Sequence, residues 1–336
     1  MPSFTSLVNT GDEMRDTTAS VLDQDLEPAS QSMTISVIIP TKNRPKDLHR
    51  TIDTLLVQTR RPDEIVVIDQ SCSPCLAEGS LPVPLVYIHA PYLSGLTEAR
   101  NLAMTRATGD IWLFLDDDVV LEQQYLEQLL LAYTPDVTGV SGIITNYNRP
   151  GISRRLFEAV FVKGSFHDDR QPAYWNSQRL RNLGPQRVRQ LGGGLMSFRA
   201  EAIRDMRFDT NLTGGCLAED IDFCARLHRG SILLIAPAAR LSHERSEIGR
   251  TTAHWLDAHA QSSAYMHLKN WNRGLADYLC FAWLRVGYLI IATLGSFKHR
   301  SFEPFRAWSQ GARRGYTLAS QAAQLPAREC PRETPA

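Results

Sequence analysis

The 336-residue sequence has no surplus of either charge, because 36 Lys and Arg residues balance 36 Asp and Glu residues. A nucleic-acid-binding protein usually carries a basic surplus or patch, so we expect no nucleic-acid partner. The first residues lack a basic segment followed by an apolar run, so we also expect no secretory signal. Cysteine is scarce, at six residues. Without a secretory signal, this count favours reduced thiols over a disulfide framework.

Other absences limit the chain further. Cys72 and Cys75 have the spacing of a metal or redox pair, but no second close pair completes a zinc site, so we expect an ordinary loop there. The sequence contains no internal repeat. Residues 1–33 lack a sustained apolar run and carry six acids against one arginine, so we expect this segment to be disordered.

From residue 34 onward, short apolar segments alternate with segments of helical periodicity. Strands alternating with helices predict βαβ units, and therefore an α/β fold with a mostly parallel sheet flanked by helices. The strands lack alternation of apolar and polar residues, as expected when helices cover both faces of the sheet. Residues 146–190 look rich in loops. The expected strands are 35–39, 64–69, 85–88, 111–115, 137–145 and 232–235, after which Leu241–His243 follows, and the expected helices begin near 45, 94, 122, 219 and 251.

Polar residues gather where the predicted strands end. Thr41 and Arg44 follow the first strand, Asp69 ends the second, and the acids Asp116–Asp118 follow the fourth. Ligands of open α/β sheets bind outside the carboxyl ends of the strands. Three adjacent carboxylates repel one another, and a divalent cation bound by their oxygens would relieve that repulsion. The alternative is a solvated acidic turn that caps the next helix.

Three further positions could belong to a site. Arg100 lies in a helix that opens after Gly95, which suits an anionic ligand, although a surface helix with an ordinary arginine is the alternative. Glu219-Asp220 begins a predicted helix, where the helix dipole favours acids in any case. His243 could be a ligand or an ordinary loop histidine.

Six segments occur in one order: SVIIPTKNRP, IVVIDQS, GLTEARNLA, GDIWLFLDDDV, GGGLMSFRAEAI and AEDIDFCARL. This ordered set, which extends from about Ile35 to His243, resembles the family 2 glycosyltransferases. These enzymes transfer sugars from nucleotide donors on the GT-A fold, a Rossmann-like sheet flanked by helices. The resemblance implies an inverting enzyme that uses a nucleotide-sugar donor, with a helical extension after the catalytic domain. A helical segment such as Tyr265–Asn270 is often present after that domain in the family.

The resemblance also implies roles for residues on the nucleotide side. Pro40, Thr41 and Arg44 edge the nucleotide pocket, Asp69 binds the base, usually uracil, or its ribose, and Arg100 lies near the nucleotide or diphosphate. The family often has two acids followed by Gly-Ser after the second strand. Here the sequence is Asp69-Gln70-Ser71, which makes the choice of UDP less definite.

The remaining implied roles concern the cation and the chemistry. Asp116 and Asp118 match the family's DxD motif, which binds Mg²⁺ or Mn²⁺ beside the nucleotide. Asp117 occupies its variable middle position, on the nucleotide side. His243 stands where some relatives have a further metal or diphosphate contact. The last set comprises the general base Asp220, the adjacent acceptor-site acid Glu219, and Gly193 and Gly194, which approach the donor sugar or acceptor closely.

Two other functions compete with this hypothesis. A sugar-1-phosphate nucleotidyltransferase has a similar sheet and acidic metal site, but it would have a glycine-rich loop where this chain has Ile39–Arg44. A non-catalytic nucleotide-sugar-binding protein of the same fold would not need both an intact DxD and an intact Glu219-Asp220.

The most apolar stretch is Leu279–Phe297, which is interrupted by Arg285 and followed by Lys298 and Arg300. It could lie at a membrane, be buried or form a dimer, or span the bilayer, where Arg285 would cost at least about 2.5 kcal/mol. We expect a catalytic domain over 34–250, a helical and possible membrane-contacting extension over 251–300, and a basic, partly disordered tail over 301–336. We also expect a glycan or lipid-linked acceptor, a role in cell-surface polysaccharide or glycolipid synthesis, and a cytoplasmic location at the inner membrane face.

Overall fold

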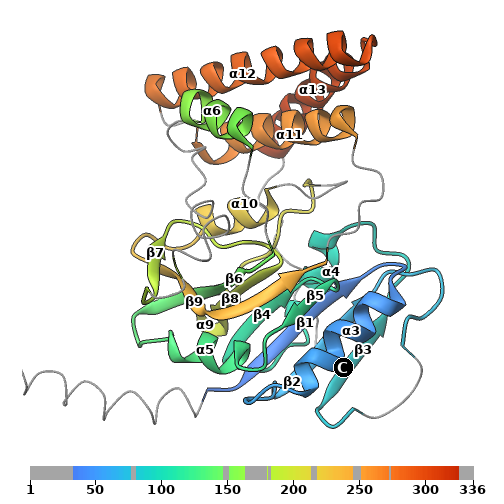
Figure 1. Ribbon diagram of the computed structural model, residues 1–336, viewed down its shortest axis with the longest axis vertical. Helices are drawn as coiled ribbons and strands as arrows, with labels where there is room; N and C mark the ends of the chain where they lie inside the picture. Colours follow the sequence, from blue (N-terminus) through green and yellow to red (C-terminus); the bar gives the residue numbers. More distant parts are fainter. Residues whose placement is uncertain are drawn as a thin grey trace, which may run out of the picture.

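The computed structural model describes residues 33–76, 81–146, 151–162, 180, 183–212, 218–244, 251–271 and 274–324. Within them, a twisted nine-stranded sheet lies at one end of the molecule and a layer of helices at the other (Figure 1). The N-terminal segment that we expected to be disordered lies almost wholly outside the described residues, as do the last twelve residues of the tail.

The first half of the sheet is parallel, with the order β3-β2-β1-β4. Helices α3 and α4 connect its strands, and Pro45 occupies the first turn of α3, where its missing N–H costs no hydrogen bond. The sequence analysis predicted each of these elements within a few residues. Their bounds are β1 Ile35–Thr41, α3 Pro45–Leu56, β2 Glu64–Asp69, β3 Leu85–His89, α4 Leu96–Met104 and β4 Ile111–Leu115.

The second half of the sheet is mixed. β8 runs antiparallel to both β4 and β6, β9 runs parallel to β6, and β5 and β7 pair with β9 in antiparallel fashion. The α/β class is therefore confirmed, and the parallel arrangement is confined largely to the first half. The elements are β5 Val119–Leu121, α5 Tyr125–Leu131, β6 Val137–Ile144, β7 Gln186–Val188, β8 Leu195–Arg199, α9 Ala200–Ile203, α10 Glu219–Ala225 and β9 Ile232–His243.

Helices and loops cover both faces of the sheet, as the continuous apolar strands predicted. Every residue of β1, β2 and β4 is buried. Successive side chains of a strand point to opposite faces. Val37 and Leu48 accordingly belong to one core cluster, while Ile38 and Ala99 belong to the other.

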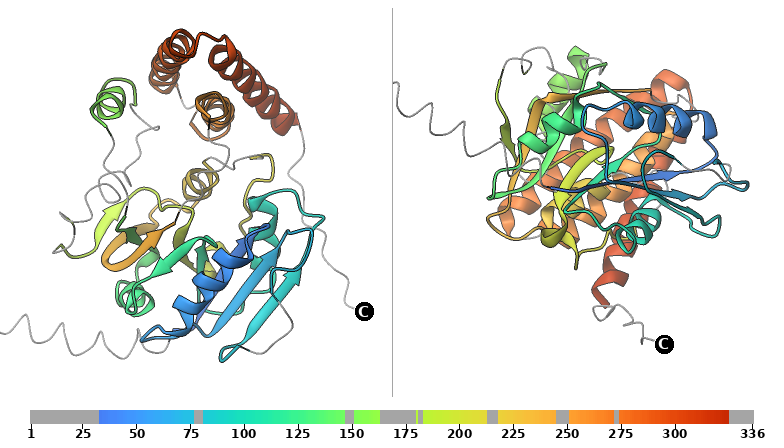
Figure 2. Two further views of the ribbon diagram at one scale, coloured as in Figure 1. Left: turned by 45° about the vertical axis from the view of Figure 1, so that its right-hand side comes forward. Right: turned by 90° about the horizontal axis from the view of Figure 1, so that it is seen from below.

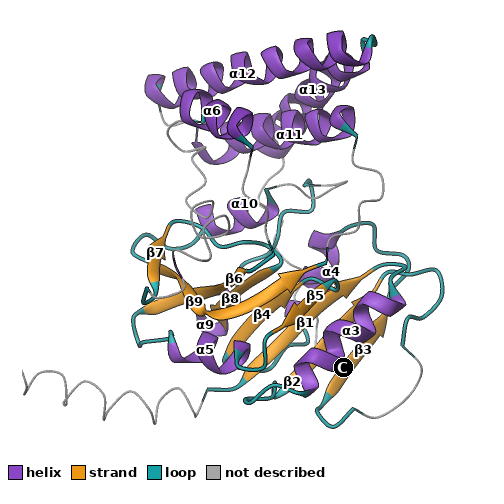
Figure 3. Ribbon diagram, viewed as in Figure 1, coloured by secondary structure: helices purple, strands orange, loops and turns teal. Residues whose placement is uncertain are grey.

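A layer of helices lies apart from the sheet, and α10 lies between the two (Figures 2 and 3). The helical extension that we expected after residue 251 is present, and it continues into α13, which covers part of the segment expected to be a basic, partly disordered tail. α6 joins this layer from within the segment expected to be rich in loops. The members are α6 Ile152–Phe161, α11 Thr252–Met266, the π-helix η2 His267–Trp271, α12 Leu275–His299 and α13 Glu303–Gln324.

Candidate active site

The parallel strands bring the predicted residues to one edge of the sheet. Thr41 and Asp69 are paired at the carboxyl ends of β1 and β2, and Asp116 follows the end of β4. β8 runs in the opposite direction, so its start lies beside the end of β4, with Leu195 opposite Leu115. The loop before β8 therefore meets the acidic loop, and the Asp116 N–H donates to the carbonyl of Gly194 at 3.2 Å.

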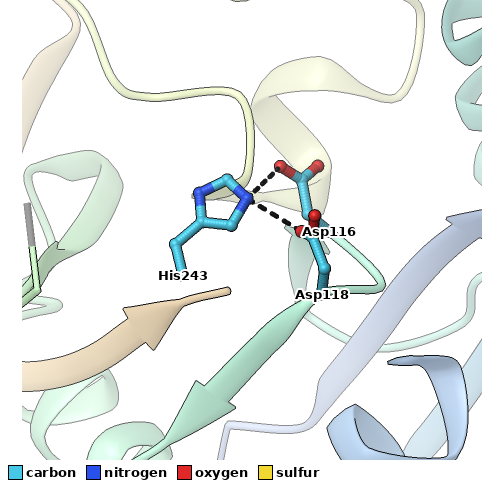
Figure 4. Close-up of side chains that lie close together, drawn as sticks. All are labelled: Asp116, Asp118 and His243. Atoms are coloured by element: carbon cyan, nitrogen blue, oxygen red, sulfur yellow. Dashed lines mark ion pairs between the residues drawn. The ribbon is translucent and has the colours of Figure 1, made fainter. Parts of the chain in front are cut away.

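His243 reaches the same edge through the pairing of β5 with β9, in which it lies opposite Val119. Its Nε2 is 2.8 Å from Asp118 Oδ1 and 3.8 Å from Asp116 Oδ2 (Figure 4). One ligand atom from each of these three residues lies within 4.8 Å of the others. The structure thus brings together the three residues that were predicted to bind metal.

These three side chains fit a divalent cation. Two carboxylates and an imidazole nitrogen are donors that Mn²⁺ accepts, and Mg²⁺ binds commonly through one or two carboxylates. Asp116 is the most accessible of the three, with 29% of its side chain exposed, while Asp118 and His243 are largely buried. Asn146 fixes the strand end, because its amide exchanges hydrogen bonds with the backbone N–H and C=O of His243.

Arg44 and Thr41 hold Asp117 and Asp118 in place. The Arg44 guanidinium lies 3.2 Å from Asp117 and 3.1 Å from Asp118, and the Thr41 hydroxyl donates to Asp117 at 2.6 Å. Burial raises the pKa of Asp117 to about 6 despite these contacts. Burial also acts to raise the pKa of Asp118, but His243 and Arg44 outweigh it, so this pKa lies below its ordinary value. The acidic loop is therefore partly neutralised by side chains of the protein.

Arg100 is fully buried between the acidic loop and α10. Its guanidinium donates to Glu219 at 3.0 Å and to the Gly193 carbonyl at 2.7 Å, and it lies 3.6 Å from Asp116. It also lies over the ring of Phe208, with its central carbon 5.3 Å from the ring centroid. The resemblance implies a position near the nucleotide or diphosphate. The structure shows that Arg100 connects Asp116 of the acidic loop with Glu219 of α10.

Glu219 and Asp220 lie in the first turn of α10, as predicted, and the helix is preceded by Ala218 with a left-handed φ of 73°. The Gly193 N–H donates to Asp220 Oδ2 at 2.8 Å. Burial and the Asp220 charge raise the pKa of Glu219, and Arg100 opposes this rise. Both acids are thus tied to the glycine loop, directly or through Arg100.

The glycines are required by the acids themselves. A Cβ at Gly193 would lie 2.5 Å from Glu219 Oε1, and one at Gly194 would overlap the Asp116 carboxylate. The resemblance implies a close approach of these glycines to donor or acceptor. In the structure, the missing side chains of Gly193 and Gly194 leave room for the carboxylates of Glu219, Asp220 and Asp116 to lie against the backbone.

Asp69 stabilises the loop that follows β2. Its carboxylate accepts hydrogen bonds from the backbone N–H groups of Ser71 and Cys75 and from the Tyr87 hydroxyl, at 2.9, 2.6 and 2.6 Å. Burial acts to raise the pKa of Asp69, but these bonds outweigh it and the pKa falls below its ordinary value. Cys72 and Cys75 are free thiols in this loop. A base or ribose could reach this carboxylate only by sharing it with the loop.

The sequence analysis missed a set of charged residues that connects α10 with the helical layer. Asp222 is fully buried. It accepts from Arg226 at 2.7 Å, from Lys269 of η2 at 2.7 Å and from Asn270 at 2.9 Å. Lys269 also bonds Asp209 at 2.5 Å. The helical layer therefore supports the helix that carries Glu219 and Asp220. The segment Tyr265–Asn270 was the available signal, although its sequence does not identify its partners.

Comparisons with known proteins agree with this geometry. A family model described as glycosyl transferase family 2 matches residues 36–206. This match covers the acids and the glycine loop and ends before α10 and His243. The succinoglycan biosynthesis protein ExoM of Rhizobium meliloti is 26% identical over 248 residues, which cover 71% of this chain and 75% of ExoM.

Two further similarities bear on the family and on the fold. The pre-mycofactocin glycosyltransferase of Mycobacterium tuberculosis is 27% identical over 62% of this chain, which spans only 42% of that protein. The crystal structure of residues 1–349 of TarS from S. aureus shares 14% identity with a TM-score of 0.50, over 87% of this chain and 92% of that chain. The TarS likeness concerns the fold alone.

Proposed function

The chain belongs to glycosyl transferase family 2 and is a glycosyltransferase, and we propose that it inverts configuration as it moves a sugar from a nucleotide-diphosphate donor to an acceptor hydroxyl. The observation that carries the proposal is the cluster of Asp116, Asp118 and His243, which Arg100 links to Glu219 of α10. A cation site that one buried arginine joins to Glu219, the acid next to the proposed base, suits a reaction in which a diphosphate leaves as a hydroxyl attacks.

We assign the cation to Asp116, Asp118 and His243. A bound Mg²⁺ or Mn²⁺ would supply Lewis-acid neutralisation of charge on the leaving diphosphate. Arg44 adds a fixed positive charge at the same edge, because it contacts both Asp117 and Asp118. Pro40, Thr41 and Asp69 would border the nucleotide, with UDP as the expected donor nucleotide.

Asp220 is proposed as the general base, which accepts the proton of the attacking hydroxyl at a carboxylate oxygen. The Gly193 N–H holds Oδ2, and the start of a helix favours the ionised form that a base requires. Glu219 would bind the acceptor, and the main chain of Gly193 and Gly194 would border the donor sugar. The reaction is then one displacement at the anomeric carbon, without a covalent sugar–enzyme intermediate.

The proposed acceptor is a growing glycan or a lipid-linked glycan at the cytoplasmic face of the membrane. The name of ExoM connects that relative to succinoglycan, a polysaccharide, which supports a role in cell-surface polysaccharide or glycolipid synthesis. Within the described part of the chain, α12 is long and apolar enough to cross a membrane by length and composition. That helix supports a membrane location for the reaction.

A thermal-shift screen tests the catalytic proposal. Purified protein is heated with UDP, GDP and their sugars, with and without Mn²⁺ or Mg²⁺. Because a ligand at about 100 times its Kd adds about 2.7 kcal/mol to the folded state, one nucleotide family should raise Tm in a metal-dependent way. Asp118→Asn should lose the metal-dependent part, and Asp53→Asn, which changes an exposed acid of α3, should keep it. Folded protein without any shift would contradict the proposal.

A further inference from the structure

We infer that α6 and α12 together form one surface that docks on an anionic lipid bilayer in the plane of the membrane. This inference deepens the proposed membrane location, on which it rests, and is independent of the catalytic assignments. It commits to a lipid surface rather than to a second copy of the chain or to a bilayer span.

The outer face of α12 is apolar along its whole length. Between its first residue and Lys298, exposed large apolar side chains recur at helical spacing along one face: Leu275, Leu279, Val286, Ile290, Leu294 and Phe297. Contiguous apolar surface of this extent on a folded protein marks an interaction site. Since these residues cover a 25-residue helix, the surface runs the length of the helical layer.

α6 extends this surface from a distant part of the sequence. Gly287 of α12 lets α6 approach closely, because a Cβ there would lie 2.5 Å from the Phe161 ring. Phe161 packs on Trp283 with ring centroids 5.2 Å apart, and the Trp283 indole N–H donates to the Val160 carbonyl at 2.8 Å. No residue of α6 is fully buried, and Leu156 is 64% exposed. A ten-residue helix is marginal by itself, so a surface that covers its apolar side would stabilise it.

Arg285 does not oppose lipid contact, although it interrupts the apolar stretch of the sequence. Its guanidinium faces inward and lies over the Trp308 ring of α13, 4.6 Å from the ring centroid. The outer face of α12 therefore does not carry the charge that interrupts its apolar sequence.

The inner face of α12 indicates contact in the membrane plane rather than a span. Leu284 and Tyr288 pack on Leu256 of α11, so α12 is part of a helical layer. α11 and α13 are joined by the partly exposed ion pair of Asp257 with Arg314. A span by α12 would carry these charges into the bilayer or strip α12 from its partners, and both are costly.

Charge at the end of α12 selects an anionic surface. Lys298, His299, Arg300 and Arg306 are exposed there, with Glu303 as the one acid among residues 298–306. The exposed rings of Phe297 and Phe302 lie among them in sequence. Basic residues next to apolar and aromatic ones are typical of helices at the headgroup level of anionic membranes.

Vesicle co-sedimentation of the full chain tests this inference, without donor, acceptor or metal. The protein should bind vesicles of phosphatidylglycerol and phosphatidylcholine, and bind pure phosphatidylcholine less. Leu156→Glu and Leu294→Glu should each weaken binding about tenfold or more, because each replaces an exposed leucine that would become buried in the lipid with a charged side chain. Val57→Glu is the matched control, since Val57 is 59% exposed on the catalytic part, and it should bind as wild type. Lys298→Gln and Arg300→Gln should each cost about fivefold.

Three results would overturn the inference. They are a wild type that binds no vesicles, a Leu156→Glu variant that binds as well as wild type, and bound protein that resists alkaline carbonate as a spanning protein does. A dimer in light scattering that the same two leucine variants dissociate would assign the surface to a second copy instead. Circular dichroism checks folding, and Leu156→Asn and Leu294→Asn replace any variant that unfolds. A wild type that shows metal-dependent nucleotide shifts but binds no vesicles would refute the surface and leave the proposed function standing.

Discussion

The carboxyl edge of the sheet and the outer face of the helical layer differ in the kind of side chain that each places unusually: the first buries charged groups, and the second exposes apolar ones. At the sheet edge, charged groups such as Arg100, Asp118 and Glu219 are buried. On the outer face of α12, large apolar groups such as Leu294 and Phe297 are exposed. Burying charge and exposing apolar surface both cost stability, and natural proteins accept such costs mainly at functional sites. The comparison therefore separates a site for chemistry from a site for attachment.

The largest effect is expected at the base. Asp220→Asn should lower kcat by about 10²–10⁴, the usual contribution of a general base, while donor binding measured by thermal shift persists. Asp205→Asn changes an exposed acid outside the site and should keep full activity. The rate of nucleotide-diphosphate release, measured with donor and acceptor present, gives kcat for each variant. A variant with near-normal kcat would remove Asp220 from the mechanism.

Arg100→Met tests how much the buried contacts of Arg100 stabilise the protein. Glu219 and the Gly193 carbonyl would lose their donor, and an uncompensated buried charge typically costs about 3–5 kcal/mol. The free energy of unfolding in urea should fall by this amount, whereas Arg106→Met, at an exposed position after α4, should change little. Equal stability of the two variants would mean that the acids do not depend on Arg100.

The helical layer should respond to pH through His259. Burial and the nearby Arg154 of α6 lower its pKa from 6.5 to about 4. Because the unfolded chain takes up this proton first, the free energy of unfolding should decrease as pH falls from about 6.5 to 4, by at most about 3 kcal/mol. His259→Gln should flatten this part of the curve in urea unfolding at several pH values. Parallel curves for the two proteins would contradict the expectation.

Lys269→Met tests the connection between the two regions. It leaves Asp222 with fewer donors and should loosen α10, so we expect kcat to fall about tenfold, or about 1.4 kcal/mol, with KM for the donor unchanged. Lys269→Arg should restore part of the rate. Lys46→Met, at an exposed position of α3, is the control. A change confined to stability, with kcat intact, would make Lys269 purely structural.

The smallest effect is expected on the outer face. Leu294→Glu should change the free energy of unfolding by no more than about 0.5 kcal/mol, because an exposed substitution loses little packing. Leu284→Ala on the inner face of the same helix, where Leu284 is 3% exposed, should cost about 2–5 kcal/mol. Urea unfolding of both variants gives the contrast. Similar losses for the two would mean that the outer face is packed in solution.

The sequence predicted the parallel part of the sheet well because each strand is a buried apolar run that ends at a polar residue. The family resemblance predicted that Asp116, Asp118 and His243 belong to one site, and the structure brings them together because β5 pairs with β9. β5 was missed because three residues give no readable pattern. β9 was predicted only over 232–235, because Pro237 and polar Arg240 interrupt the apolar pattern before Leu241.

Contacts between distant segments were not predictable. The burial of Arg100, the neutralisation of Asp222 by η2 and the packing of α6 on α12 each join residues far apart in the chain. Periodicity describes one segment at a time and does not show which segments meet. Gly193 and Gly194 are an example. The family resemblance implies that they approach the donor or acceptor closely, and only the structure shows that carboxylates of the protein lie against them.

The pairing of Val119 with His243 has a consequence for synthesis of the protein. A chain that has emerged only as far as β8 contains the three acids, Arg100 and the glycine loop, but neither Asp220, the proposed base, nor His243. A pairing shifted by one residue would turn the histidine to the opposite face of the sheet. In the proposed mechanism the catalytic centre is therefore incomplete until β9 pairs in register, and we expect a nascent or truncated chain that ends at β8 to transfer no sugar.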